Sequence, residues 1–348
     1  IIADHMFSYA TMVVDMDAHD NEQTNTLKTL RSYITFPINN LAKDEFAFSF
    51  YFGPNKHNIL NNYNIKLEKQ IQLGGKLFSW INRFAVLPIF NFFEKFNWSY
   101  GIIILILTVI LKIILLPLAY KSYTSTAKMR VVKPEVEEIN KRYPKQEDAM
   151  KKQQAVMAMY RQVGVKPMAG CLPMLLQMPI LIAMFRFFPS AYELRQQPFL
   201  WADDLSTYDS ILDLPFNIPF YGDHVSLFTL LMTIATLTYT IVNNKMMNTG
   251  GNEQQMKMMK TMMYIMPIMF LGIFNNYSSG LSYYYFLVNI ITFIQMAAFR
   301  FAVNEDKLRS KMMAAKAKPV KKSKWQQRME DMVKAQQAAQ RDATKRRR

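Results

Sequence analysis

Residues 99–120 read SYGIIILILTVILKIILLPLAY, and this stretch decides what class of protein the chain forms. A helix needs roughly 20 mostly apolar residues to cross about 30 Å of hydrocarbon, because each residue adds about 1.5 Å. The stretch has that length, and Lys112 is its only charged residue. It therefore predicts a membrane-spanning helix.

Four more apolar blocks follow, so we predict an all-α polytopic membrane protein with five spans. The blocks lie at about 168–188, 225–242, 262–275 and 281–302. The fourth is short and needs the methionines that precede it to reach across a bilayer. Several spans contain proline, which membrane bundles tolerate because neighbouring helices satisfy the carbonyl groups that proline leaves unpaired.

The charges of the connecting segments alternate, and this alternation predicts the orientation. Residues 121–167 carry eleven Lys/Arg against five acids, whereas residues 189–224 carry only Arg195 against six acids. Residues 243–261 carry three lysines and one glutamate, and residues 303–348 carry fifteen Lys/Arg against five acids. Basic loops stay on the cytoplasmic side. The N-terminal part is therefore expected outside and the C-terminus inside.

The part before the first span is predicted to comprise two units. Residues 1–75 are expected to be the end of a larger β-domain, because phenylalanine alternates with other residues at positions 46, 48, 50 and 52. The chain starts at Ile1 without a methionine, so we expect a truncated or processed fragment. Residues 76–97 are rich in aromatic residues and predict an amphipathic helix on the membrane surface, kinked or broken at Pro88.

Residue types that carry catalysis or bind metals are scarce. Cys171 is the only cysteine, which excludes an intramolecular disulfide and a cysteine-based zinc site. The four histidines are scattered, and the chain contains no phosphate-binding loop, dinucleotide fingerprint or GxSxG motif. We therefore expect a protein that is not an enzyme and that uses no cofactor or metal.

Lys112 lies in the middle of the first predicted span, where a charge costs roughly 2.5–3.5 kcal/mol and usually faces a polar cavity. The alternative is that its side chain extends to the membrane surface near Lys121. That residue is about 13 Å of helix rise away, more than a lysine side chain readily covers. We therefore expect a polar cavity around Lys112, with Thr108 one turn earlier on the same face.

A matching polar stripe follows the fifth predicted span. Four polar side chains recur there at spacings of three, four and three: Ser282, Tyr285, Asn289 and Thr292. Gln177 is the main polar residue deep in the second span. Hydrogen bonds between helices would also explain such residues. No acid lies in any span to neutralise the lysine, however, so we favour a wet groove that attracts acidic peptide segments.

For each of the two long basic segments the sequence allows more than one structure or ligand. Residues 121–167 predict two helices closed by Pro144 and by Gly164 with Pro167, although a solvated charged loop is the alternative. The lysine-rich tail is expected to bind RNA, ribosomes or anionic lipid, and its charge does not distinguish among them.

Several motifs together resemble one membrane-protein family. KSYTSTAKMRVVKPEVEEINKRY occupies residues 121–143, GCLPMLLQMPI occupies 170–180, ELR occupies 193–195 and SGL with Tyr284 and Tyr285 follows at 279–281. In this order and spacing, over about residues 76–310, the chain resembles the YidC/Oxa/Alb membrane protein insertases.

The resemblance implies a five-helix membrane core at residues 98–302, with a hydrophilic groove open to cytoplasm and lipid. It also implies a cytoplasmic helical hairpin at 121–167, an external interfacial helix at 76–97 and a basic cytoplasmic tail at 303–348. In Gram-negative members a periplasmic β-sandwich comes first, and residues 1–75 resemble only its end.

The function implied is that of an insertase and chaperone for nascent membrane proteins in the bacterial inner membrane, without nucleotide hydrolysis. The implied partners are the Sec translocon, the ribosome through the tail and hairpin, and the lipid bilayer. The substrate groove is predicted to contain Lys112, Thr108, Gln177, Ser282, Tyr284, Tyr285, Asn289 and Thr292. The family's groove cation is typically arginine, and a lysine offers a point charge without the bidentate fork.

Two other classes of function remain open at this point. A small-solute transporter or channel would favour two similar halves and acids near the middle of the membrane, and no internal repeat is visible. A structural assembly scaffold is the other alternative.

Overall fold

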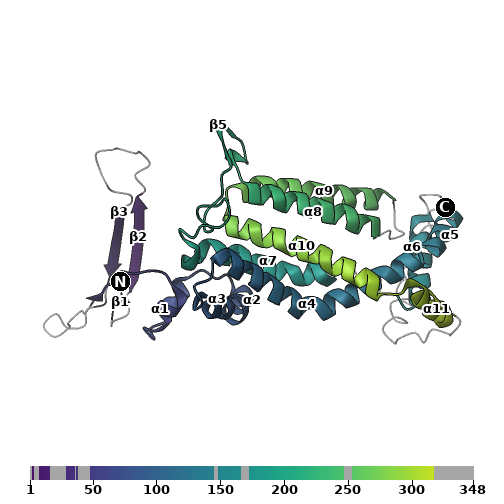
Figure 1. Ribbon diagram of the computed structural model, residues 1–348, viewed down its shortest axis with the longest axis horizontal. Coiled ribbons are helices and arrows are strands. Elements are labelled where there is room, and N and C mark those ends of the chain that lie inside the picture. Colours follow the sequence, from purple (N-terminus) through teal and green to yellow (C-terminus); the bar gives the residue numbers. More distant parts are fainter. Residues whose placement is uncertain are drawn as a thin grey trace, which may run out of the picture.

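The computed structural model describes residues 2–3, 8–15, 29–35, 37, 48–144, 148–165, 172–246 and 253–316. Cys171, Phe46 and residues 317–348 of the predicted basic tail lie outside these described residues. Long helices dominate the described chain and run roughly along one axis, with strands toward one end and a helical hairpin at the other (Figure 1).

Each of the five predicted spans overlaps one helix of the structure. These helices are α4 (Tyr100–Val131), α7 (Leu172–Ser190), α8 (Leu227–Met246), α9 (Glu253–Asn275) and α10 (Ser279–Ala302). Within the described residues, three stretches are long and apolar enough to cross a membrane: Tyr100–Val131, Leu227–Asn244 and Ser279–Ala302. Leu175–Ser190 is a shorter apolar helix. The predicted class, an all-α polytopic membrane protein, is confirmed.

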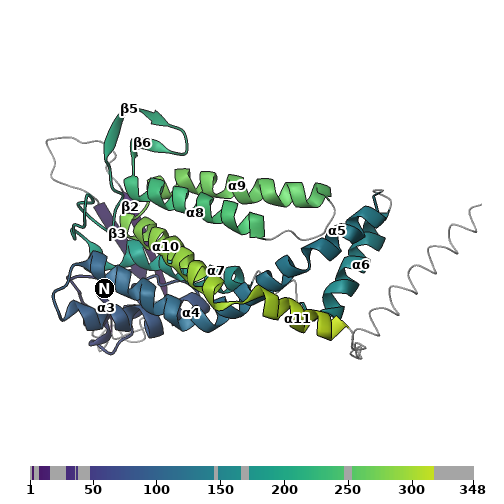
Figure 2. The ribbon, with the colours of Figure 1, turned by 45° about the vertical axis from the view of Figure 1, so that its right-hand side comes forward.

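Helix α10 is central among the five helices. Helix α10 lies between α4 and α8, and α9 packs against α8 (Figures 1 and 2). Helix α7 contacts both α4 and α10. This arrangement leaves α4 and α7 on one side of α10 and the α8–α9 pair on the other.

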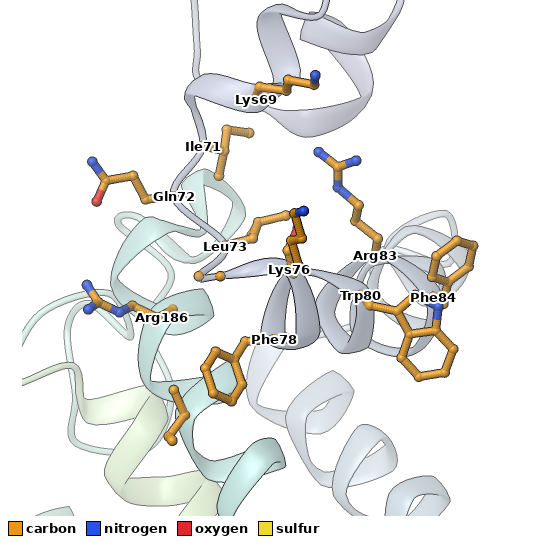
Figure 3. A pocket seen from close by; sticks show the side chains of 14 residues that line it. Lys69, Ile71, Gln72, Leu73, Lys76, Phe78, Trp80, Arg83, Phe84 and Arg186 are labelled. Atoms are coloured by element: carbon orange, nitrogen blue, oxygen red, sulfur yellow. The ribbon is translucent and has the colours of Figure 1, made fainter.

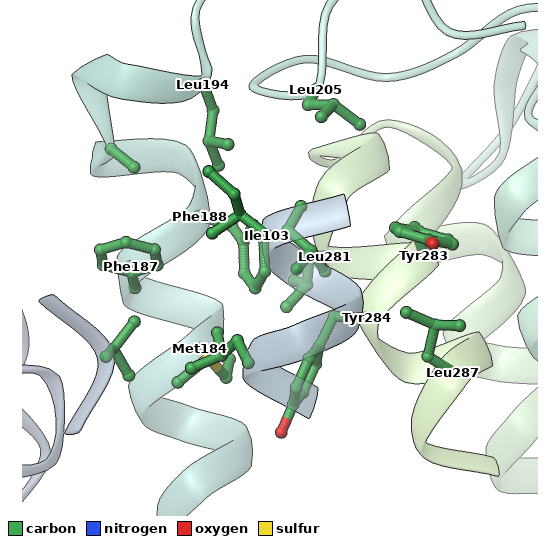
Figure 4. Close-up of a cluster of buried hydrophobic side chains, with 14 of the residues drawn as sticks. Ile103, Met184, Phe187, Phe188, Leu194, Leu205, Leu281, Tyr283, Tyr284 and Leu287 are labelled. Carbon is green, nitrogen blue, oxygen red and sulfur yellow. The ribbon is translucent and has the colours of Figure 1, made fainter. Parts of the chain in front are cut away.

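The tightest packing lies near the N-terminal end of α4. Side chains from α4, α7 and α10 meet there with almost no exposed surface: Ile103, Met184, Phe187, Phe188, Leu281 and Tyr284 (Figure 4). A Cβ atom at Gly101 would lie 2.2 Å from the ring of Phe199, so only glycine allows this approach. The dense end of the bundle is therefore the end at which α4 begins.

Short helices precede α4, and residues 76–94 form one continuous helical run with a π-helical turn inside it, close to the helix predicted for residues 76–97. These elements are α1 (His57–Asn61), η1 (Leu67–Gln70), α2 (Lys76–Ile81), the π-helical turn η2 (Asn82–Val86) and α3 (Leu87–Glu94).

The irregular part of this run is the π-helical turn, which lies directly before Pro88, the residue at which a kink or break was predicted. Pro88 occupies the first turn of α3, in which its missing N–H group costs nothing. The turn is instead held by Asn82, whose amide donates to the carbonyl oxygens of Leu73 at 3.1 Å and Ala183 at 3.0 Å. Because Ala183 belongs to α7, this side chain fixes the surface segment to the bundle.

The hairpin begins later than the predicted boundary at residue 121. Helix α4 continues without a break to Val131, through Pro117, a proline that a membrane bundle tolerates inside a helix. The hairpin proper is α5 (Lys133–Arg142) and α6 (Ala149–Gln162), and helix α11 (Glu305–Lys316) packs against its base.

An apolar cluster and one ion pair join the hairpin to the segment after α10. The buried side chains of the cluster are Met129, Val132, Val136, Val156, Met159, Tyr160, Val163, Val165 and Met312. Arg130 of α4 also lies 3.2 Å from the carboxylate of Glu305. The two-helix interpretation of this segment is thus correct, and α11 was not anticipated.

In the described part of the chain the strands form three small antiparallel pairs. Strand β1 (Ile2–Ala3) pairs with β4 (Phe48–Ser49), and β2 (Tyr9–Asp15) pairs with β3 (Thr29–Thr35). Most described side chains of these strands are exposed. The assignment of residues 1–75 to the end of a β-sandwich stays a prediction.

The third strand pair, β5 (Leu212–Ile218) with β6 (Gly222–Val225), leads into α8. Asn275, at the end of α9, accepts a hydrogen bond from the Ser226 amide at 3.0 Å. Its own amide donates to the carbonyl oxygens of Tyr221 and His224 at 2.9 and 2.8 Å. The strand pair is therefore tied to the α9 terminus.

A buried carboxylate caps the start of α8. Asp209 is only 2% exposed, and it accepts hydrogen bonds from the Leu227 and Phe228 amides at 2.9 and 3.1 Å. It also accepts from the Trp201 indole N–H at 2.9 Å and from the Ser226 hydroxyl. The carboxylate thus satisfies N–H groups that a helix N-terminus leaves unpaired, and it faces the positive end of the helix dipole.

Candidate functional site

A cavity of about 290 Å³ lies between α4, α7, α8, α9 and α10. We call it the Lys112 cavity. Its polar lining is Lys112, Gln177, Thr233, Thr236, Tyr239, Tyr285, Asn289 and Thr292. Its apolar lining is Met178, Leu181, Met232, Pro267, Phe270, Phe274 and Val288. All five predicted spans thus contribute side chains to one cavity. Most of its polar side chains come from α4, α8 and α10.

The Lys112 ammonium group points into this cavity. Its Nζ donates to the Thr292 hydroxyl at 2.8 Å, and the Gln295 amide donates to the Lys112 carbonyl oxygen at 3.3 Å. The next two residues, Ile113 and Ile114, are 60% and 63% exposed and form the outward face of α4. Lys112 is therefore held between α4 and α10 instead of extending to the end of the helix.

The charge of Lys112 has no counterion among the described residues. No acid lines the cavity, and no described carboxylate lies within ion-pair distance of its Nζ. A buried cation is costly unless polar groups or water solvate it. The hydroxyl and amide groups around it can donate to and accept from water or the polar part of a ligand, and an anionic group would supply the missing charge.

Helix α8 forms a polar wall that the sequence analysis missed. Asn289 of α10 donates to the Thr236 hydroxyl at 2.9 Å, and Thr233 and Tyr239 line the same side. The signal was present, because threonine recurs on α8 at positions 229, 233, 236 and 240, a spacing of four, three and four. These threonines were overlooked because a hydroxyl can return its hydrogen bond to its own helix, as Thr236 does to Met232.

Tyr285 presents an unpaired polar group to the cavity. Its hydroxyl is buried, and no hydrogen-bond partner lies within reach in the described part of the chain. Buried hydroxyl groups are almost always satisfied by protein or by water. The hydroxyl is thus available to a water molecule or to a ligand in the Lys112 cavity.

Five of the eight predicted groove residues line this cavity, and Thr108, Ser282 and Tyr284 do not. Thr108 has no exposed surface, and its hydroxyl donates to the Ile104 carbonyl oxygen at 2.7 Å. Ser282 lies 3.0 Å from the Thr229 hydroxyl at the dense end of the bundle. Tyr284 is 1% exposed and packs in the apolar core, with its ring centroid 5.9 Å from that of Phe188. Their assignment to the groove stays a prediction.

Metal binding has no visible basis in the described residues. No group of three or more His, Cys, Asp or Glu side chains gathers there in a way that could hold an ion. The cavity itself contains neither a carboxylate nor a thiol among its described lining residues. Its arrangement suits the weak binding of polar or anionic groups.

Comparisons with known proteins identify the family to which this architecture corresponds. Residues 92–307 match the model of the family described as 60Kd inner membrane protein. The chain is 51% identical over 334 residues to a protein of Parabacteroides distasonis, which covers 92% of this chain and 52% of that protein. It is 46% identical to one from Porphyromonas gingivalis, covering 92% of this chain and 53% of the relative.

A protein of Bacteroides fragilis is 49% identical over 296 residues, or 83% of this chain and 48% of the relative. All three relatives bear the name membrane protein insertase YidC, and the chain spans about half of their length. Taken with the long apolar helices, these matches make the protein a multi-pass protein of the inner membrane. The matched region contains every helix that lines the Lys112 cavity, and the chain therefore belongs to the 60Kd inner membrane protein family, the insertase family that its motifs resemble.

Proposed function

We propose that this protein facilitates the insertion and folding of nascent membrane proteins, as a membrane protein insertase that uses no covalent chemistry. One observation carries the proposal: Lys112 occupies a polar cavity inside an apolar bundle, with no carboxylate among its described lining residues. Such a charge can hold an acidic or polar peptide segment weakly. The shared name of the relatives supports the same function.

The mechanism follows from the two faces of α4 and α10. The polar part of an entering chain exchanges some of its water for the Lys112 ammonium and the hydroxyl groups of Thr292 and Tyr285. Its apolar segment meanwhile slides along the outward faces, where Ile113 of α4 and Ile294 of α10 are exposed. Transfer of that segment to lipid is favourable, and the cavity shortens the distance over which polar groups lack water.

Reconstitution tests this function directly. Purified protein in liposomes should promote insertion of a short membrane protein with an acidic tail, and it should not increase the flux of small solutes. Protein-free liposomes are the control for spontaneous insertion. Solute flux without insertion would identify a transporter or channel, and the absence of both activities would favour a scaffold.

The proposed orientation puts the hairpin in the cytoplasm and the β5–β6 pair in the periplasm. It rests on the alternating loop charges and predicts how engineered cysteines react. In a Cys171→Ser background, Asp213→Cys should be labelled by an impermeant maleimide in intact spheroplasts. Lys141→Cys should be labelled only after the membrane is permeabilised. Both wild-type side chains are exposed, so accessibility within the fold does not limit either reaction. Labelling of Lys141→Cys in intact spheroplasts would invalidate the orientation.

The proposed partners follow from this orientation. Substrates are nascent membrane proteins, and the basic residues of 121–167 and 303–348 supply charge for contact with the ribosome. The apolar outward faces of the helices provide surface for the Sec translocon. Crosslinking from Lys141→Cys to translating ribosomes, compared with Asp213→Cys on the opposite end, would test the ribosome contact.

A further inference from the structure

A second, larger pocket lies at the opposite side of the bundle from the hairpin. Its volume is about 760 Å³, and it is enclosed by the segment before α2, by α2 and η2, and by α7 (Figure 3). We call it the α2 pocket. It shares no lining residue with the Lys112 cavity, and the proposed insertase mechanism makes no use of it.

Four cationic side chains line the α2 pocket: Lys69, Lys76, Arg83 and Arg186. No acid is part of the described lining, and none of the four cations forms an ion pair with a described carboxylate. The Nε of Arg83 is buried and lacks a hydrogen-bond partner in the described chain. Glu68, the nearest acid in sequence, lies outside the lining. The pocket therefore concentrates positive charge that the protein itself leaves uncompensated.

The geometry of these cations suits a compact anion. In Figure 3, Lys69, Lys76 and Arg83 lie around one side of the pocket, and Arg186 of α7 lies at the opposite rim. Several N–H donors arranged around an open space match the oxygen atoms of a phosphate group, which accepts from both lysine and arginine.

An apolar rim adjoins the charged part. Trp80 and Phe84 lie side by side with ring centroids 5.6 Å apart, and they are 60% and 67% exposed (Figure 3). Exposed tryptophan and phenylalanine beside basic residues are typical of helices that lie in the headgroup region of a membrane. An anion bound here would thus have an apolar surface next to it that fits an acyl chain.

The location of the α2 pocket strengthens the case for a specific ligand. It lies toward the end of the bundle that carries β5 and β6, opposite the α5–α6 hairpin (Figure 1). The connecting segment at that end, residues 189–224, has six acids and one arginine. The four cations of the pocket contrast with this acidic segment at the same end of the bundle. The general preference for basic loops in the cytoplasm therefore does not explain them.

We infer that the α2 pocket binds the phosphate headgroup of an anionic phospholipid in the periplasmic leaflet. The phosphate lies among Lys69, Lys76 and Arg83, on the side of the pocket next to the aromatic rim, and an acyl chain follows Trp80 and Phe84 into the bilayer. The apolar rim favours a lipid over a free phosphate ion, because an inorganic ion would leave those rings without a partner. The assignment to the periplasmic leaflet rests on the proposed orientation, whereas the site itself depends on the membrane location and not on the proposed insertase function.

Quenching of Trp80 by brominated lipid tests this inference. The full chain is reconstituted in phosphatidylcholine vesicles containing a minor fraction of brominated phosphatidylglycerol or, separately, of brominated phosphatidylcholine. The Trp80 signal is the difference between wild type and Trp80→Phe. Phosphatidylglycerol should quench it more strongly, and neutralising Lys76 or Arg83 should lower that preference about fivefold, as expected for a basic side chain at an anionic headgroup.

Charge reversal provides the matched comparison. Lys76→Glu and Arg83→Glu should each remove the preference for phosphatidylglycerol, and their emission in pure phosphatidylcholine should match that of wild type. Lys95→Glu, at an exposed lysine beside α3 that does not line the pocket, should retain the preference. Equal quenching by both lipids, or equal loss in all three variants, would overturn the site. Loss of the preference on adding inorganic phosphate, but not chloride at the same ionic strength, would assign the pocket to a free ion instead.

Discussion

Insertion of acidic-tailed substrates should fall about tenfold or more when Lys112 is replaced by leucine, since a hydrogen bond to a charged group contributes roughly 1.5–3 kcal/mol. The loss should be smallest for substrates with uncharged tails, because the leucine variant removes the charge and leaves Thr233, Thr236 and Asn289 in the cavity wall. The variant should be at least as stable as wild type, because a desolvated cation is removed. The measurement is the insertion yield at equal protein level.

Two further variants make this test specific. Lys112→Arg should retain most of the activity, because it keeps a cation in the cavity. Lys121→Leu removes an exposed lysine of the same helix outside the cavity and should leave the yield unchanged. Tyr285→Phe should cause a smaller loss of the same kind. If Lys112→Leu and wild type gave equal yields for both types of substrate, the charge would have no part in insertion.

Replacing Asp209 with alanine should destabilise the protein by roughly 3–5 kcal/mol, the range found when one partner of a buried charged network is removed. The substitution leaves the Leu227 and Phe228 amides and the Trp201 indole N–H without their acceptor. The midpoint of thermal unfolding in detergent should therefore drop markedly. Asp203→Ala, which removes an exposed carboxylate from the same segment, should leave the midpoint nearly unchanged.

The Asp209 variant also separates stability from function. Because the network lies at the α8 terminus and outside the Lys112 cavity, the fraction of protein that remains folded should insert substrate at the wild-type rate. An unfolding midpoint for Asp209→Ala equal to that of Asp203→Ala would show that the cap contributes little.

The membrane-spanning helices could be predicted because their signal is local. Apolar length alone locates α4, α8 and α10, and a mid-span lysine is conspicuous because it is expensive there. The residues at which helices begin and end were harder to predict from the sequence. Pro117 and the change from apolar to polar residues suggested that the span ends near residue 121, yet the helix runs through it to Val131. The position of Pro88 suggested a break, although a first-turn proline is compatible with a helix start.

The site was predictable only where one residue type stands out from its surroundings. Lys112, Gln177 and the polar positions of α10 stand out in apolar sequence, and five of the predicted residues do line one cavity. Thr108 and Ser282 occupy the same sequence pattern, yet they turn their hydroxyl groups to Ile104 and Thr229. That choice depends on how neighbouring helices are rotated, which spacing along a single helix does not reveal. The α2 pocket is the extreme case, since it joins Arg186 to residues about a hundred positions earlier.

The unbroken length of α4 also sets a scale for whatever passes between the hairpin and the cavity. Val131, at the hairpin base, follows Lys112 by nineteen residues, which corresponds to about 28 Å of continuous helix. An extended chain covers that span with about nine residues at roughly 3.3 Å each. The helix length therefore sets a minimum length for a polar tail that contacts both sites. A tail much shorter than about nine residues cannot touch the hairpin base and Lys112 at the same moment. A longer tail can reach Lys112 before it leaves the hairpin base.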